Sequence, residues 1–193
     1  IKKLAQLAHD KGAWIHCDAA QAVGKIPINV YEMDIDLLSL SGHKLYGPKG
    51  IGALFGRGGA YALPLKPLLL GGGQEWELRP GTLNVPGIVG LGKACEIAKS
   101  ELAEEAQRIA KLRDRLEQII LSSVQGAWCN GAINNRLPGN SNLSFPGIDA
   151  EALIVNLPEL AISTGSACTS VAPEPSHVLL AIGLSRDEAY SSI

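Results

Sequence analysis

The fold of this chain is decided by the segment Asp36-Leu37-Leu38-Ser39-Leu40-Ser41-Gly42-His43-Lys44. Residues 36–41 form a short apolar run with the length and composition of a buried strand. Small and polar residues end the run, and they hold the amine of Lys44 where it can reach a ligand. Ser41 and His43 supply a hydroxyl and an imidazole, which are suitable partners for a phosphate.

A second apolar run, residues 13–17, lies upstream and ends in Asp18. In open α/β sheets ligands gather at the carboxyl ends of the strands, so we expect Asp18 and Lys44 at one edge of the sheet. An acid and an amine beside phosphate partners predict a site for pyridoxal phosphate (PLP). The lysine forms a Schiff base with PLP, and the aspartate keeps the pyridine nitrogen protonated. Taken singly, both residues are equally compatible with ordinary loop charges.

The composition excludes several classes of protein. The chain has 193 residues and a formal net charge of -2, which leaves no basic face for nucleic acid. It contains no 18-residue apolar stretch and no signal peptide, so we expect no membrane partner. Its four cysteines lack the spacing of a metal site or a disulfide framework. We therefore expect reduced thiols, in the cytoplasm or an organellar matrix.

The first part of the chain predicts an α/β fold with a mainly parallel sheet. A helix over residues 1–12 opens an alternation of helix-like and strand-like pieces, which is typical of strands joined by crossovers. The predicted strands are residues 13–17, 36–41 and 51–55. The Gly- and Pro-rich segment 56–85 is too long for a plain connection, and we expect it to be functional.

The second part predicts a long helix and then a small α+β domain. Pro86 suits the first turn of a helix over residues 87–121, whose charged face is a solvated surface. We then expect two strands, over residues 143–145 and 160–163. We also expect two helices, one over residues 149–157 capped by Asp149 and one over residues 176–182 capped by Ser176 and ended by Gly183. The chain starts without Met inside an apparent helix, and residues 191–193 begin a new segment, so we expect a fragment of a longer enzyme.

Cys168 lies in a run of small residues, 163–170, that leads into a Pro-rich loop. A thiol in such a segment is accessible and mobile, as a catalytic thiol that visits a pocket and leaves it must be. A reactive thiol also needs a lowered pKa, so a passive loop cysteine stays an alternative. For Cys17, Cys95 and Cys129 we expect buried, inert thiols.

Five motifs follow one another in a family-specific order. They are Asp18-Ala19-Ala20-Gln21, Ser41-Gly42-His43-Lys44 with Gly47-Pro48-Lys49-Gly50-Ile51-Gly52, Gly71-Gly72-Gly73-Gln74-Glu75, Arg79-Pro80-Gly81-Thr82, and Ser163-Thr164-Gly165-Ser166-Ala167-Cys168. In this order they resemble the PLP-dependent cysteine desulfurases of the iron–sulfur assembly type, in the class V aminotransferase group of fold-type I enzymes. The resemblance implies that residues 1–97 are the C-terminal part of a PLP-binding large domain. Residues 98–193 would be the small domain that carries the Cys168 loop.

The resemblance also implies which residues bind PLP. Lys44 would form the Schiff base and later act as the general base at the substrate α-carbon, and Asp18 would pair with the pyridine nitrogen. Gln21 would form a hydrogen bond with the phenolic oxygen of the cofactor. The phosphate would be bound by Ser41 and His43 and, from the partner subunit of a homodimer, by Thr82.

The implied reaction converts L-cysteine to L-alanine. Cys168 would take the sulfur as a persulfide and pass it to an iron–sulfur scaffold or another acceptor protein, for cluster or thio-cofactor assembly. The long loop after Cys168 resembles that of desulfurases which hand sulfur directly to scaffold proteins. No metal site is implied, although Cys168 could transiently hold an iron–sulfur cluster through its persulfide.

The chain departs from the family pattern in a few places. Gln74 stands where a histidine is often found, and Trp76 where an arginine or another large residue is common; we expect both to be tolerated because they flank the site. The ring-stacking histidine and the arginine for the substrate carboxylate would lie outside the chain, which implies a fragment without its N-terminal part and extreme C-terminus. His9 and His16 match no family role and are interpreted as structural or surface residues.

Two alternative functions stay open at this point. A selenocysteine lyase or another class V PLP enzyme would share Asp18 and Lys44 but would not need Cys168. An inactive truncated sulfur-acceptor or scaffold-binding module would use the long helix and the Cys168 loop only to dock a partner.

Overall fold

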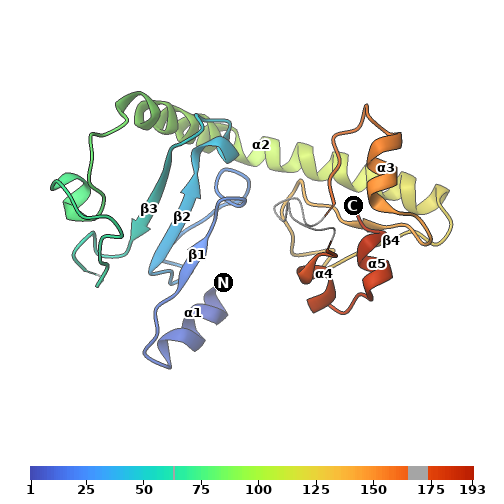
Figure 1. The fold of residues 1–193 in the computed structure, drawn as a ribbon, viewed down its shortest axis with the longest axis horizontal. Coiled ribbons are helices and arrows are strands. Elements are labelled where there is room, and N and C mark those ends of the chain that lie inside the picture. Colours follow the sequence, from blue (N-terminus) through green and yellow to red (C-terminus); the bar gives the residue numbers. More distant parts are fainter. Residues whose placement is uncertain (63, 165–173) are drawn as a thin grey trace. The chain divides into compact units, whose positions relative to one another are not determined.

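The computed structural model describes residues 1–62, 64–164 and 174–193 (Figure 1). The chain divides into two compact units, Ile1–Ala106 and Gln107–Ile193. The division falls inside one long helix, α2 (Val85–Ser123). The predicted helix over residues 87–121 is thereby confirmed. The predicted boundary between residues 97 and 98 concerns the domains of a whole enzyme and stays a prediction.

Unit 1 is built on a three-stranded sheet of β1 (His16–Asp18), β2 (Leu37–Ser41) and β3 (Gly52–Gly56), in that order. β1 and β2 are parallel, and β2 and β3 are antiparallel. The described strands thus form a mixed sheet, and the expectation of a mainly parallel one is wrong for the β2–β3 pair. The connection over residues 42–51 is shorter than the dozen or so residues that a parallel crossover needs.

Alternation along the strands decides which side chains enter the core of unit 1. Leu38, the second residue of β2, is buried with Ala19 and Ile35. A second cluster joins Leu45, just beyond β2, to Leu91 and Ala94 on α2. Burial of one leucine side chain contributes roughly 1.5–3 kcal/mol. The first half of α2 is therefore held against the segment that follows β2. Upstream of the sheet, α1 (Lys2–His9) buries Ala5.

The segment between β3 and α2 contains a short 3-10 helix, η2 (Gln74–Glu77). Glu75, Trp76 and Glu77 have φ angles of 49°, 55° and 64°, which are left-handed conformations that non-glycine residues rarely adopt. Each costs about 1–2 kcal/mol relative to the right-handed form. All three side chains are exposed, so contacts within unit 1 do not offset that cost.

Unit 2 contains the second half of α2, a small sheet and three short helices. β4 (Trp128–Cys129) and β5 (Leu143–Ser144) are antiparallel, and Ser192 bridges to Ser144 on the other side of β5. The helices are α3 (Ala150–Asn156), α4 (His177–Ala181) and α5 (Arg186–Tyr190). α3 and α4 confirm two predicted helices together with their predicted capping residues, Asp149 and Ser176.

The predicted strand over residues 160–163 is wrong. Residues 160–163 are not in a strand, and their backbone hydrogen bonds to other described residues are local, such as Ile162 N–H to the Leu160 carbonyl oxygen at 3.1 Å. The free edge of β5 is taken instead by the end of the chain, where Leu143 N–H donates to the Ile193 carbonyl oxygen at 2.8 Å. An apolar run alone therefore did not identify the segment that pairs with this edge of β5. No helix in the described parts of the chain combines the length and the apolar character needed to cross a membrane.

Candidate functional site

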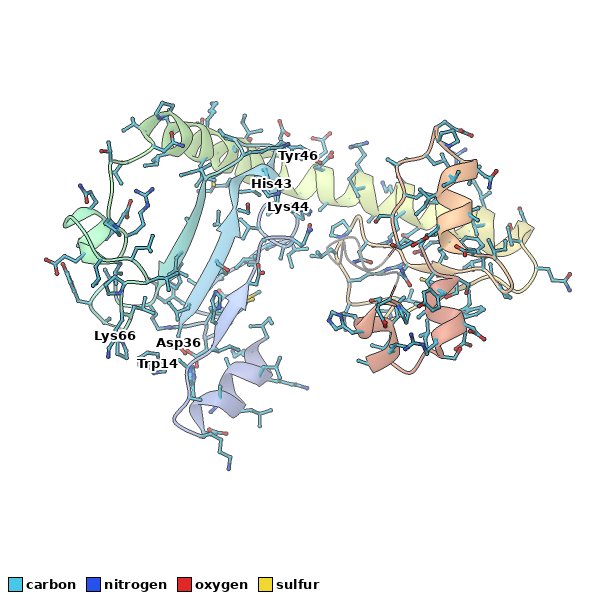
Figure 2. All side chains as sticks on the ribbon, viewed as in Figure 1. Trp14, Asp36, His43, Lys44, Tyr46 and Lys66 are labelled. Atoms are coloured by element: carbon cyan, nitrogen blue, oxygen red, sulfur yellow. The ribbon has the colours of Figure 1, made fainter. Side chains whose placement is uncertain are left out.

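The carboxyl ends of β1 and β2 lie at the same edge of the sheet, because these two strands are parallel. Asp18, the last residue of β1, is opposite Ser39, and the Ala19 N–H donates to the Ser39 carbonyl oxygen at 2.9 Å. β2 ends at Ser41, and the 3-10 helix η1 (Gly42–Leu45) follows at once. Figure 2 shows His43 and Lys44 together at this end of unit 1, away from Asp36 at the start of β2.

η1 fixes the backbone of Lys44 and leaves its side chain exposed. The Gly42 N–H donates to the Ile51 carbonyl oxygen at 2.8 Å, and its own carbonyl oxygen accepts from the Gly47 N–H at 3.0 Å. A Cβ atom on Gly42 would lie 2.9 Å from Ile51 Cγ2, so only glycine fits this turn without a shift. Lys44 is exposed, whereas Leu45, which directly follows it, is buried. The turn is thus anchored on one side and offers an amine on the other.

Asp18 is exposed at the strand end and is oriented by the backbone. One carboxylate oxygen, Oδ1, accepts from the Ala20 N–H at 2.9 Å. The second oxygen can still accept from another donor, as pairing with a protonated pyridine nitrogen requires.

Two histidines pair with serine hydroxyls near this edge. His43 Nδ1 lies 2.9 Å from Ser41 Oγ, so the two predicted phosphate partners are in direct contact with each other. His16 Nε2 lies 3.1 Å from Ser39 Oγ. Since His16 and Asp18 are two residues apart on one strand, both project from the same face of the sheet. We interpreted His16 from the sequence as a structural or surface residue. Its spacing of two residues from Asp18 is the sequence signal that it lies beside the site.

Gln21 lies in the turn after β1 and contacts a lysine that the sequence reading missed. Lys25 Nζ donates to Gln21 Oε1 at 3.0 Å. Burial and then the positive charge of Lys44 lower the pKa of the Lys25 ammonium. Lys25 thus forms a hydrogen bond with Gln21 and is repelled by the charge of Lys44. The only sequence signal for Lys25 is its position four residues after Gln21.

The last two predicted site residues are Thr82 and Cys168. Thr82 is in the loop between η2 and α2, where its carbonyl oxygen accepts from Arg79 Nη1 at 3.3 Å. Cys168 lies outside the described residues. The other three cysteines are free thiols, each partly buried. The described part of the chain holds no group of three or more His, Cys, Asp or Glu side chains arranged for a metal ion.

The groups at this edge match the chemistry of PLP. An amine, a carboxylate and an amide come from Lys44, Asp18 and Gln21, and a hydroxyl and an imidazole come from Ser41 and His43. The backbone of Gly42 packs too tightly for a side chain in the turn that carries His43 and Lys44. The donor set therefore fits the aldehyde, pyridine nitrogen, phenolic oxygen and phosphate of the cofactor. The individual roles remain predictions.

Comparison with known proteins agrees with this fit. A family model described as Aminotransferase class-V matches residues 1–186, so the chain belongs to the aminotransferase class-V family. Within that family it is similar to cysteine desulfurases. It is 51% identical over 195 residues to a cysteine desulfurase of Gluconacetobacter diazotrophicus and 47% identical over 193 residues to one of Mus musculus. The alignments cover 100% of this chain but 48% and 42% of those proteins.

Solved structures show the same relationship. A NifS-like protein from Rickettsia africae matches with a TM-score of 0.87 and 30% identity, over 99% of this chain and 50% of that one. A structure titled SspA in complex with cysteine matches with a TM-score of 0.77 and 40% identity, over 99% and 52%. The predicted family and the fold-type I architecture are confirmed. The chain spans about half the length of the curated relatives it matches.

Proposed function

We propose that this chain is part of a PLP-dependent cysteine desulfurase that converts L-cysteine to L-alanine. The observation that carries the proposal is the position of Lys44, exposed on an anchored turn just past β2, at the edge where β1 presents Asp18. The similarity to cysteine desulfurases over the whole chain supports this reaction among those of the family. The similarity to SspA, whose title names a complex with cysteine, supports the substrate.

In this reaction each site residue has its own role. Bound PLP supplies an electron sink for negative charge at the substrate α-carbon. The second oxygen of Asp18 holds the proton on the pyridine nitrogen, and Ser41 and His43 orient the phosphate. Lys44 holds the cofactor covalently at rest, and its free amine takes the α-proton of the substrate.

Sulfur leaves the substrate through Cys168. Its thiolate attacks the substrate sulfur, so that a sulfur–sulfur bond forms as the carbon–sulfur bond breaks, and the electron pair of the broken bond stays with the carbon fragment. The product on the protein is a Cys168 persulfide, which an iron–sulfur scaffold or another acceptor protein takes up. Because the thiolate is the nucleophile, turnover should fall as the pH drops below the pKa of this thiol.

The assembly and location follow the same proposal. We place Thr82 at the phosphate of a partner subunit, which makes the enzyme a homodimer. Cys17, Cys95 and Cys129 are free thiols in the structure, which supports a reducing compartment such as the cytoplasm or an organellar matrix.

The test uses the full-length protein with PLP and L-cysteine. Alanine is quantified, and the mass of the Cys168 peptide is measured before and after reaction. One extra sulfur on Cys168, together with alanine, supports the proposal. Lys44→Ala should abolish both alanine formation and borohydride trapping of PLP, whereas Cys168→Ser should abolish alanine formation and leave the trapping of PLP intact. Alanine formation that survives Cys168→Ser moves the function to a selenocysteine lyase or another class V enzyme. If PLP cannot be trapped on Lys44, a non-catalytic docking module replaces the proposal.

A further inference from the structure

Lys25 determines which way the amide of Gln21 faces. Its Nζ lies 3.0 Å from the Gln21 side chain. An ammonium group only donates hydrogen bonds, so the Gln21 atom that faces it must be the carbonyl oxygen. The Nε2 group of Gln21, which carries two donor hydrogens, is then turned away from Lys25. The contact thus resolves an orientation that an isolated glutamine would leave open.

The backbone that carries both residues is fixed. Between Gln21 and Lys25 the chain forms consecutive turns, with the Val23 N–H donating to the Ala19 carbonyl oxygen at 3.0 Å and the Lys25 N–H to the Ala22 carbonyl oxygen at 3.0 Å. A Cβ atom on Gly24 would lie 2.4 Å from Leu45 Cδ2, so this turn packs directly on the end of η1. Lys25 and Gln21 are therefore held beside the helix that carries Lys44.

The electrostatic environment of Lys25 agrees with this placement. Burial and the nearby charge of Lys44 lower the pKa of the Lys25 ammonium. Burial of a lysine ammonium beside another lysine costs free energy unless the ammonium donates a hydrogen bond to an acceptor. Among the described residues, the Gln21 oxygen is that acceptor.

We propose that Lys25 is a positioning residue of the cofactor site: by engaging the Gln21 carbonyl oxygen, it presents the Gln21 Nε2 donor to the phenolic oxygen of bound PLP. The inference rests on the proposed function, since it assigns a task to Lys25 only if PLP binds beside Gln21. Lys25 acts through Gln21 and does not touch the cofactor.

The test is a double-mutant cycle on the full-length protein, read by PLP binding. The apoprotein is titrated with PLP, and both the dissociation constant and the visible absorption band of the bound cofactor are recorded. Lys25→Met should raise the dissociation constant about three- to fivefold, the range expected for one partly exposed hydrogen bond to a charged group. It should also shift the absorption band in the same direction as Gln21→Leu. Lys25→Arg keeps a donor and should restore most of the affinity.

The cycle distinguishes positioning from a general loss of structure. In a Gln21→Leu background, Lys25→Met should have no further effect, because its route to the cofactor has been removed. Lys11→Met, at an exposed lysine of unit 1, is the control for loss of a positive charge and should change neither the dissociation constant nor the absorption band. Gln21→Glu leaves Lys25 a partner but removes the donor, so it should weaken PLP binding even if Lys25→Met fails to fold.

Three results would overturn the inference. Wild-type affinity and band position in Lys25→Met would show that Gln21 does not need Lys25. Additive effects in the double variant would show that Lys25 acts on the site independently of Gln21. Unchanged binding in Gln21→Glu would show that Gln21 donates nothing to the cofactor. In each case the wild-type protein still binds PLP, so the proposed function stands; a wild-type protein that binds no PLP removes both.

Discussion

The imidazole of His9, the last residue of α1, lies 2.8 Å from the carboxylate of Asp36, measured from Nε2 to Oδ2. Its other ring nitrogen, Nδ1, lies 3.2 Å from Asp34 Oδ2. A ring that faces a carboxylate on each side is best satisfied as an imidazolium, which donates from both nitrogens. Asp36 also accepts from the Ile15 N–H at 2.9 Å. One buried carboxylate thus ties α1 to the segments that enter β1 and β2.

The first prediction concerns the pH dependence of this contact. The hydrogen bond to Asp36 raises the pKa of His9 above 6.5, against the effect of burial, and the charges of Asp36 and Asp34 add to the rise. Since the folded-state pKa is raised, the stabilisation is complete below the ordinary value of 6.5 and is lost as the pH rises through the raised value. The midpoint temperature of thermal unfolding should therefore decrease as the pH is raised from about 6 to about 8. His9→Ala should reduce this change of the midpoint temperature with pH, whereas His177→Ala, at an exposed histidine of α4, should leave it as in the wild type. If the midpoint temperature changes equally with pH in both variants, His9 is not the cause.

The second prediction is the acid side of the same contact. Burial alone would raise the pKa of Asp36, but hydrogen bonds from His9 and the Ile15 N–H lower it overall. A lowered folded-state pKa means that the stabilisation is present above the ordinary value of 3.8 and is lost as the pH falls through the folded value. Asp36→Asn should remove this loss and should destabilise the protein at neutral pH by about 1–3 kcal/mol. Denaturant unfolding at several pH values checks both effects, and a variant that keeps the acid-side loss contradicts the assignment.

The third prediction concerns a buried ion pair in unit 2. Glu117 on α2 accepts from Arg136 Nη1 at 2.6 Å and from Ser141 Oγ at 2.7 Å, and the pair is nearly enclosed, with 10% of each side chain exposed. The hydrogen bond from Arg136 lowers the pKa of Glu117. Arg136→Met leaves the carboxylate buried without its countercharge, which should cost about 3 kcal/mol in the free energy of unfolding.

A matched control for that variant is available in the same unit. Arg186 lies 3.4 Å from Glu174, with 61% and 67% of the two side chains exposed. Because water screens this pair, Arg186→Met should reduce the free energy of unfolding by far less than Arg136→Met does. Equal losses in the two variants would mean that burial does not set the value of the Glu117–Arg136 pair.

The fourth prediction separates backbone fit from helix propensity at two glycines. Gly42→Ala would bring its Cβ to 2.9 Å from Ile51 Cγ2 and 3.0 Å from the Ile51 carbonyl oxygen, so we expect a loss of about 1–3 kcal/mol. It should also reduce borohydride trapping of PLP on Lys44, because the same turn carries that amine. Gly92→Ala on α2 meets nothing within 4 Å and should gain about 0.5–1 kcal/mol. Thermal midpoints of the two variants should therefore move in opposite directions, and a shared direction would refute the argument.

Local signals made much of this fold predictable from the sequence. Asp149 accepts from the Glu151 and Ala152 N–H groups at 2.8 Å and 3.2 Å, and Ser176 caps α4 in the same manner, so both helix starts follow from short-range chemistry. The end of β2 at Ser41 agrees with the predicted strand 36–41, whereas β1 covers His16–Asp18 in place of the predicted residues 13–17. The family resemblance predicts the site residues as a set, and their roles stay predictions.

The remaining features depend on contacts between distant segments. The place of residues 191–193 beside β5, in preference to 160–163, is decided by pairing across the unit and not by composition. The antiparallel direction of β3 follows from a connection too short for a crossover, a signal that the sequence reading did not use. Lys25 became part of the candidate site only when the structure placed its ammonium against Gln21.

The turn after β2 also has a consequence for the speed of the reaction. Leu45 is anchored in the core and Lys44 beside it is exposed, so the amine can change its partner by rotation about its own side-chain bonds. Such rotations take picoseconds to nanoseconds, whereas loop rearrangements extend to microseconds. If Lys44 has the proposed role, one lysine would both hold the cofactor and receive a proton without a change in the backbone. Slow conformational steps in turnover should accordingly arise away from this turn.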